Sequence, residues 1–246
     1  MRVRGAFQAM VLLAMLLAFS GCSLRGKPGP GPEVPRPDSV LNPAVLYSQN
    51  CAGCHGAEGN KGAAMAIGDP LYLAIVDDNT LRTTISKGRT GTAMSAFAQK
   101  EGGMLTDQQI DAIIHGIRER WGKPNVLSGT VAPPYAAKAP GNAQQGQAVY
   151  NTFCASCHGT DNKGGPKAGS VTNGAYLSLI SDQGLRTIVI AGRPDFNAPD
   201  WRNNVPGRPM TDQEISDVVT WLAAQRPQLS PMPYAANAAS SSGGVQ

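Results

Sequence analysis

The 246-residue chain has few charged, aromatic and cysteine residues, and these shortages exclude several classes of protein. Charged residues make up 15% of the sequence, which is too few for a highly charged disordered tail. The 21 Lys and Arg residues nearly balance 17 Asp and Glu, and no basic stretch alternates with aromatic residues, so we expect no nucleic-acid partner. The hydrophobic fraction of 41% is typical of a globular protein and not of one with many membrane spans.

The N-terminus has the pattern of an export signal. Arg2 and Arg4 precede an apolar run over residues 9–19, and small residues follow it. This run is shorter than the roughly 20 residues that a helix needs to cross a bilayer. We therefore interpret residues 1–21 as a cleaved signal peptide and not as a permanent membrane span.

Residues 19–22, Phe-Ser-Gly-Cys, resemble the lipobox of bacterial lipoproteins, although Phe stands where Leu is usual. In that family the Cys is acylated and becomes the first residue of the mature chain, so the resemblance predicts lipidation of Cys22. The acyl chains would hold the protein at a membrane face, in the periplasm or at the cell exterior. The alternative is an ordinary signal peptide followed by an unrelated Cys.

Two further segments have compositions that do not form a core. Residues 22–42 contain five prolines between Pro28 and Pro37, which favours an extended polyproline-like structure, so we interpret them as a tether. Residues 228–246 are rich in Ala, Ser and Gly, and we expect a flexible tail.

The rest of the chain is a duplication. Residues 47–121 can be laid over residues 150–222 with few gaps, and the matching segments keep their order throughout. The segment between the repeats, residues 123–142, is rich in Pro, Gly, Ala and Asn and is predicted to be a linker. We therefore expect two domains, residues 43–122 and residues 143–227.

The sequence predicts an all-α fold for both domains. Thr106 and Thr211 each stand three residues before a Gln or Glu, which is the capping-box start of a helix. Apolar residues then follow at helical spacing, and these are Ile110, Ile113, Ile114 and Ile117 in the first repeat and Ile215, Val218, Val219 and Leu222 in the second. No run of alternating apolar and polar residues is long enough to form a sheet.

Four of the five Cys and two of the three His residues fall in two clusters of the form C-x-x-C-H, which is the attachment signature of c-type haem. Thiols three positions apart lie about one helical turn from each other, so both can bond to vinyl groups on one side of a porphyrin. The adjacent imidazole can then bind the iron. The clusters contain Cys51, Cys54 and His55 in the first repeat and Cys154, Cys157 and His158 in the second.

Two other uses of such clusters fit the sequence less well. A thioredoxin-like redox pair also has the form C-x-x-C, but it occurs in a βαβ setting that this chain lacks. A structural zinc site needs four Cys or His ligands close together, and the two clusters are far apart in the sequence. Domains of this size also bury only about 60% of their surface, so a large apolar cofactor would fill each core.

On these motifs the chain resembles the cytochrome c family, as a tandem di-haem protein of two class I domains over about residues 43–227. The resemblance implies two c-type haems, each wrapped by a small bundle of helices in which the N-terminal helix crosses the C-terminal one. It also implies that a Met from a loop before the last helix completes the iron coordination.

The loop from Gly88 to Phe97 resembles that Met-bearing loop, so we expect Met94 to be the sixth ligand of the first iron. Met65 and Met104 are its competitors, and they are better explained by packing around the porphyrin. A His/Met pair raises the midpoint potential relative to two His ligands.

The second repeat departs from this pattern. When its Gly-Arg pair is laid on that of the first repeat, Ala198 falls at the place of Met94, and Ala cannot bind iron. Met210, just before the helix cap Thr211, is the predicted replacement. The alternative is that Met210 only packs at the helix start, as Leu105 does, and the second iron then has an open face for a small gas or peroxide.

The resemblance implies that the chain carries single electrons between the donor and acceptor complexes of a respiratory chain and is not an enzyme. Its partners would be redox proteins, and a lipid anchor would hold it at the membrane. Two alternatives stay open at this point. One is a haem enzyme or gas sensor with a five-coordinate second haem, and the other is a haem subunit of a larger respiratory complex.

Overall fold

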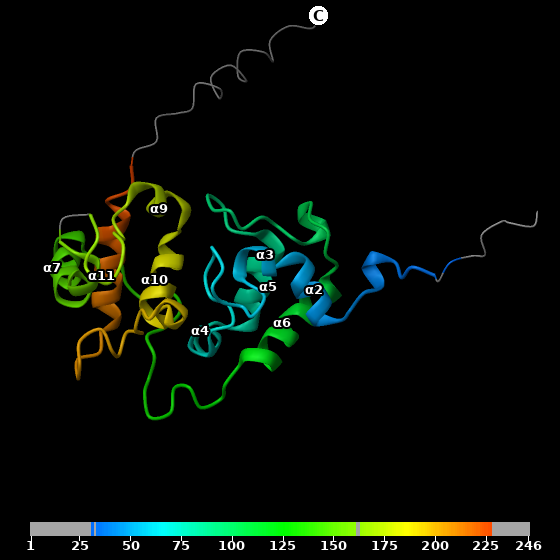
Figure 1. The fold of residues 1–246 in the computed structure, drawn as a ribbon, viewed down its shortest axis with the longest axis horizontal. Helices are drawn as coiled ribbons and strands as arrows, with labels where there is room; N and C mark the ends of the chain where they lie inside the picture. The colour runs from blue at the N-terminus through cyan, green and yellow to red at the C-terminus, as the bar shows by residue number, and fades with distance from the viewer. Residues whose placement is uncertain (1–30, 32, 161–162, 228–246) are drawn as a thin grey trace, which may run out of the picture. The chain divides into compact units, whose positions relative to one another are not determined.

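The computed structural model describes residues 31, 33–160 and 163–227 (Figure 1). The chain divides into a first unit that ends at Ser39 and a second unit that begins at Val40 and contains both repeats. The predicted signal peptide, Cys22 and the tail lie outside the described residues. In the described ranges, no helix is long and apolar enough to span a membrane.

All regular elements in the described part of the chain are helices, and the only β-type pairings there are two isolated bridges. This confirms the predicted all-α fold. The described part of the first unit contains one short 3-10 helix, η1 (Pro37–Ser39).

The five α-helices of each repeat follow one another in the same order, as the duplication predicts, whereas the 3-10 helix follows Met94 in the first repeat and precedes Ala198 in the second. The first repeat consists of α2 (Pro43–Asn50), α3 (Ala52–His55), α4 (Pro70–Ile75), α5 (Asp78–Lys87), η2 (Gln99–Glu101) and α6 (Asp107–Trp121). The second consists of α7 (Ala143–Phe153), α8 (Ala155–His158), α9 (Gly174–Leu179), α10 (Asp182–Ala191), η3 (Pro194–Phe196) and α11 (Asp212–Ala223).

Short polar side chains determine where most of these helices begin. Eight of the described α-helices follow an Asn, Asp, Ser or Thr whose side-chain oxygen accepts a hydrogen bond from the first turn. Both predicted capping boxes are present, with the Thr106 hydroxyl accepting from the Gln109 N–H and the Gln109 side chain accepting from the Thr106 N–H. The same two bonds join Thr211 and Glu214.

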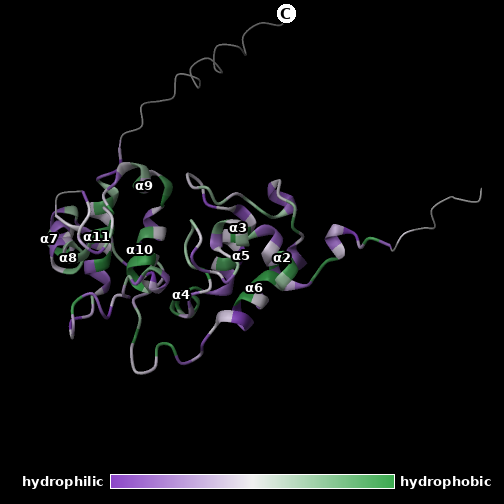
Figure 2. Cartoon of the chain, viewed as in Figure 1, coloured by the Kyte–Doolittle hydropathy of each residue, from purple (hydrophilic) through white to green (hydrophobic). Residues whose placement is uncertain are grey.

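The apolar residues form two clusters, each drawn almost entirely from one repeat. All the Ile, Val and Leu residues predicted to face inward on α6 and α11 are buried. Figure 2 shows hydrophobic residues along α6 and α10. Two buried residues pack in the cluster of the other repeat: Ala191 belongs to the cluster of the first repeat and Leu71 to that of the second.

The first and last helices of each repeat cross at a glycine, α2 with α6 and α7 with α11 (Figure 1). A Cβ atom on Gly116 of α6 would lie 2.4 Å from the Cβ of Pro43 in α2. In the second repeat the glycine is on the other helix, where a Cβ atom on Gly146 would lie 2.1 Å from the carbonyl oxygen of Asp217. The glycine is on a different helix in each repeat, but in both repeats the crossing leaves no room for a Cβ atom at that position.

An aromatic pair covers each crossing and ties it to the C-x-x-C-H segment. Tyr47 meets Trp121 with ring centroids 5.0 Å apart, and Tyr150 meets Trp221 at 4.7 Å. The Tyr47 hydroxyl donates to the Gly56 carbonyl at 2.8 Å, and the Tyr150 hydroxyl makes the equivalent bond to Gly159 at 2.7 Å.

The predicted linker lies against both repeats. Val126, Leu127 and Ala132 pack on the apolar cluster of the second repeat, whereas Tyr135 packs on that of the first. The buried guanidinium of Arg186 donates to the carbonyl of Tyr135. The composition of this segment did not predict these contacts, because they depend on single side chains.

Substitution of Gly146 by Ala should lower the free energy of unfolding by about 1–3 kcal/mol, because the new methyl group forces α7 away from α11. Helix propensity alone predicts the opposite sign. Urea unfolding of the haem-loaded protein, followed by circular dichroism, measures the change. Gln147→Ala, at an exposed neighbouring position, is the control and should leave the midpoint nearly unchanged. Equal midpoints for the two variants would show that the close approach does not constrain the fold.

Candidate functional site

Each C-x-x-C-H segment forms a single helical turn directly after the first helix of its repeat. In the first repeat, the Cys54 and His55 N–H groups both donate to the carbonyl of Cys51, at 3.2 and 3.0 Å. The second repeat has the same pattern, with the His158 N–H donating to the Cys154 carbonyl at 3.0 Å. The two thiols of each segment are therefore about one turn apart, with the imidazole at the end of the turn, as the spacing predicts.

A backbone carbonyl fixes the tautomer of each imidazole. Nδ1 of His55 donates to the Met65 carbonyl at 2.8 Å, and Nδ1 of His158 donates to the Gly169 carbonyl at 2.7 Å. A carbonyl oxygen only accepts, so the ring proton is on Nδ1 and the lone pair of Nε2 is left for a metal. Burial lowers the pKa of His55, and the nearby Arg193 lowers it further, although the Met65 carbonyl opposes the shift. The neutral ring that iron ligation requires is thus favoured.

The four Cys residues in these segments form no disulfides. Burial raises the pKa of Cys51 to about 11 and that of Cys154 to about 12. A C-x-x-C redox pair needs the opposite shift, because its attacking thiol works as a thiolate. The environment therefore disfavours the thioredoxin-like alternative and suits thioether bonds to a buried apolar group.

The loop that carries Met94 is held by its own backbone. Gly88 has a left-handed φ of 67°, and the Arg89 N–H donates to the Met94 carbonyl at 2.8 Å. Met94 is half-buried, and its N–H donates to the Thr92 hydroxyl at 3.2 Å. Of the competitors, Met104 is 74% exposed, and Met65 supplies the carbonyl that orients His55. Ligation by Met94 stays a prediction.

The corresponding loop of the second repeat shares two backbone features with the first. Gly192 has a left-handed φ of 73°, and the Arg193 N–H donates to the Ala198 carbonyl at 3.0 Å. Ala198 therefore occupies the backbone position of Met94, as the overlay of the two sequences predicts.

Met210 is buried in the apolar cluster of the second repeat, with an exposed fraction of 3%. Its N–H donates to the Trp201 carbonyl at 2.9 Å, and the Leu105 N–H makes the equivalent bond to Phe97 at 2.7 Å. Both residues directly precede the capping Thr of a last helix, so Met210 occupies the backbone position of Leu105. Its predicted role as the sixth ligand of the second iron is not tested by these contacts and stays a prediction.

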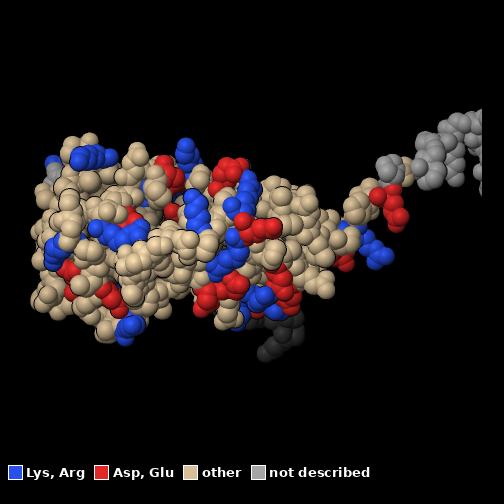
Figure 3. Space-filling view, turned by 90° about the horizontal axis from the view of Figure 1, so that it is seen from below, with Lys and Arg blue, Asp and Glu red and all other residues tan. Residues whose placement is uncertain are grey.

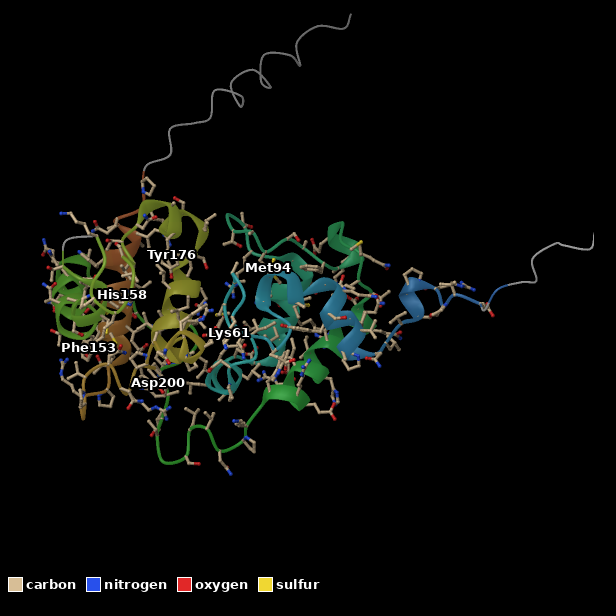
Figure 4. All side chains as sticks on the ribbon, viewed as in Figure 1. Lys61, Met94, Phe153, His158, Tyr176 and Asp200 are labelled. Atoms are coloured by element: carbon tan, nitrogen blue, oxygen red, sulfur yellow. The ribbon has the colours of Figure 1, made fainter. Side chains whose placement is uncertain are left out.

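The Ala198 loop also contacts the first repeat. The Asp195 carboxylate accepts a hydrogen bond from the Lys61 N–H at 2.8 Å and pairs with Arg193 at 2.8 Å. These bonds hold the Asp195 side chain at 4% exposure, and the hydrogen bonds from Arg193 lower its pKa. Lys61 belongs to the loop between His55 and Met65 (Figure 4), so the second repeat contacts the loop that orients the first imidazole.

Paired thiols, an imidazole with a free Nε2 and an apolar core fit a covalently attached haem in each repeat. Comparison with protein families supports this assignment. The model of "Cytochrome C oxidase, cbb3-type, subunit III" matches residues 38–115, and the model of "Cytochrome c" matches residues 143–226.

Individual proteins are similar over most of the chain. The "Cytochrome bc1 complex cytochrome c subunit" of Mycobacterium bovis and that of Mycobacterium tuberculosis are each 25% identical over 232 residues, which is 90% of this chain and 77% of the relative. A solved chain from the reducing HAO-like protein complex of Kuenenia stuttgartiensis is 16% identical, with a TM-score of 0.43, and the match covers 79% of this chain and all of that one.

Substitution of Met94 by Ala should remove the sulfur-to-iron charge-transfer band of the first haem in the oxidised protein, because Ala has no sulfur to bind the iron. Absorption spectroscopy measures the band, and Met104→Ala is the matched control because its side chain is exposed. A band of unchanged intensity in Met94→Ala would rule out this ligand.

Proposed function

Because this chain belongs to the cytochrome c family, as two haem-binding domains in tandem, we propose that it is a membrane-anchored carrier of single electrons in a respiratory chain. The observation that carries the proposal is the pair of C-x-x-C-H turns, each with its imidazole held by a backbone carbonyl. When bound, each haem supplies reversible one-electron chemistry.

The residues around each site favour such a role because they leave little to rearrange. Each imidazole is fixed by one hydrogen bond to the loop that follows it. At the helix crossings, the Tyr47 and Tyr150 hydroxyls donate hydrogen bonds to the carbonyl of the residue that follows each of these imidazoles. A site held in this way changes its charge with little movement of the protein.

The surface charge suits partners that are not strongly charged. Figure 3 shows Lys and Arg side chains interspersed with Asp and Glu on the face that it draws. The total of 21 basic and 17 acidic residues is also close to balanced. We therefore do not propose long-range electrostatic steering between this chain and a highly charged partner. Docking would depend on short-range contacts.

The donors and acceptors proposed here are complexes of a respiratory chain, because the mycobacterial relatives are named as subunits of a cytochrome bc1 complex. The same likeness favours a second candidate, in which this chain is itself a haem subunit of such a complex. In both cases Cys22 is the proposed site of the lipid anchor.

Substitution of Cys22 by Ala should release the protein from the membrane without loss of haem, because the acyl chains would no longer be attached. Fractionation of cells that express wild type, Cys22→Ala or the control Ser23→Ala measures the change. A Cys22→Ala protein that stays in the membrane fraction with the wild-type mass would refute the anchor. A variant that lacks lipid mass but stays membrane-bound through other subunits would favour the second candidate.

The released Cys22→Ala protein should take up two electrons from a quinol when membranes with a quinol-oxidising complex are added. Stopped-flow absorption of the haem bands measures this uptake. Uptake that is as slow with the membranes as without them would contradict the carrier role and favour an integral subunit.

A further inference from the structure

We propose that the second repeat leaves one axial face of its haem open to a small neutral diatomic molecule of the class of carbon monoxide, nitric oxide or oxygen. The inference rests on the proposed haem attachment and goes beyond the proposed electron transfer. In this proposal Met210 does not bind the second iron, and the open position lies beside Ala198.

The first step is the backbone equivalence of Ala198 and Met94. Both follow a left-handed glycine, and a Cβ atom on Gly88 or Gly192 would lie 2.4 or 2.7 Å from the carbonyl oxygen of Met94 or Ala198. In both loops the Arg after that glycine donates its N–H to the same carbonyl. The second repeat therefore presents a methyl group where the first presents a thioether.

The second step is that the Ala198 loop is fixed. Arg193 and Ala198 exchange two backbone hydrogen bonds, of 3.0 and 2.9 Å, whereas the first repeat makes only the first of this pair. Asp195 adds the bonds to Arg193 and to the Lys61 N–H. These contacts stabilise the loop without a bond from it to the metal.

The third step concerns Met210, the only Met in residues 143–227. Leu105 fills the equivalent place in the first repeat, where it is 4% exposed, so the position needs only an apolar side chain. Met210 packs in the same cluster as Trp201, and its sulfur lies 4.0 Å from the side-chain amide nitrogen of Asn204. Packing accounts for its burial without a bond to iron. The only His in this range is His158, which takes the other axial face.

The nature of the ligand follows from the surroundings. The change from a thioether side chain to a methyl group frees space for only a few atoms. Trp201, three residues after Ala198, packs with Met210 in the apolar cluster of this repeat, and an apolar surrounding favours a neutral molecule over an anion.

Titration of the dithionite-reduced full-length protein with carbon monoxide tests the inference by absorption difference spectra. We expect one carbon monoxide per two haems in the wild type and none in Ala198→Met, whose new thioether would fill the site. Met210→Leu introduces the residue type that Leu105 provides in the first repeat, with little change in volume, and this variant should also bind one carbon monoxide. Met94→Ala should bind two.

A wild type that binds no carbon monoxide would overturn the inference. If binding then appears in Met210→Leu, Met210 is the ligand of the second iron. The haem content of the same samples separates this failure from that of the proposed function. Two haems without carbon monoxide binding would refute only the open face, whereas fewer than two haems would refute the attachment on which both proposals depend.

Discussion

The hydrogen bond from each imidazole Nδ1 to a backbone carbonyl is the constraint on which both sites depend. This bond joins the C-x-x-C-H turn to the loop that follows it. The accepting carbonyls belong to Met65 and Gly169, which lie 10 and 11 residues after His55 and His158. The bond also orients the ring so that Nε2 is available. The aromatic pair at the helix crossing is tied to the same segment by a Tyr hydroxyl, so packing and ligand orientation are coupled in each repeat.

The two repeats keep this constraint and diverge elsewhere. The glycine at the helix crossing is Gly116 on the last helix of one repeat and Gly146 on the first helix of the other. The loop before the last helix carries Met94 in one repeat and Ala198 in the other. In the second repeat this loop bonds through Asp195 to the loop next to the first site. The loop that carries the predicted iron ligand Met94 in the first repeat thus corresponds to a loop that makes a contact between the two repeats in the second.

The sequence predicts the parts of this structure that depend on local patterns. The helical class, the capping boxes at Thr106 and Thr211, and the thiol spacing all follow from residues close together in the chain. The glycine at each helix crossing was not predicted, although the alignment of the two repeats places Pro43 on Gly146 and Gly116 on Trp221. The packed linker and the Lys61–Asp195 bond depend on contacts between residues far apart in sequence, and no local pattern carries them.

Covalent attachment of haem to each repeat is the central claim, and the mass of the denatured protein tests it most directly. Protein matured in a host with a complete haem-attachment system should carry the mass of two haems. Replacement of Cys51 and Cys54 by Ala should remove one, and replacement of Cys154 and Cys157 should remove the other. A wild-type chain with one haem, with none, or with haem that is lost on denaturation would contradict the account.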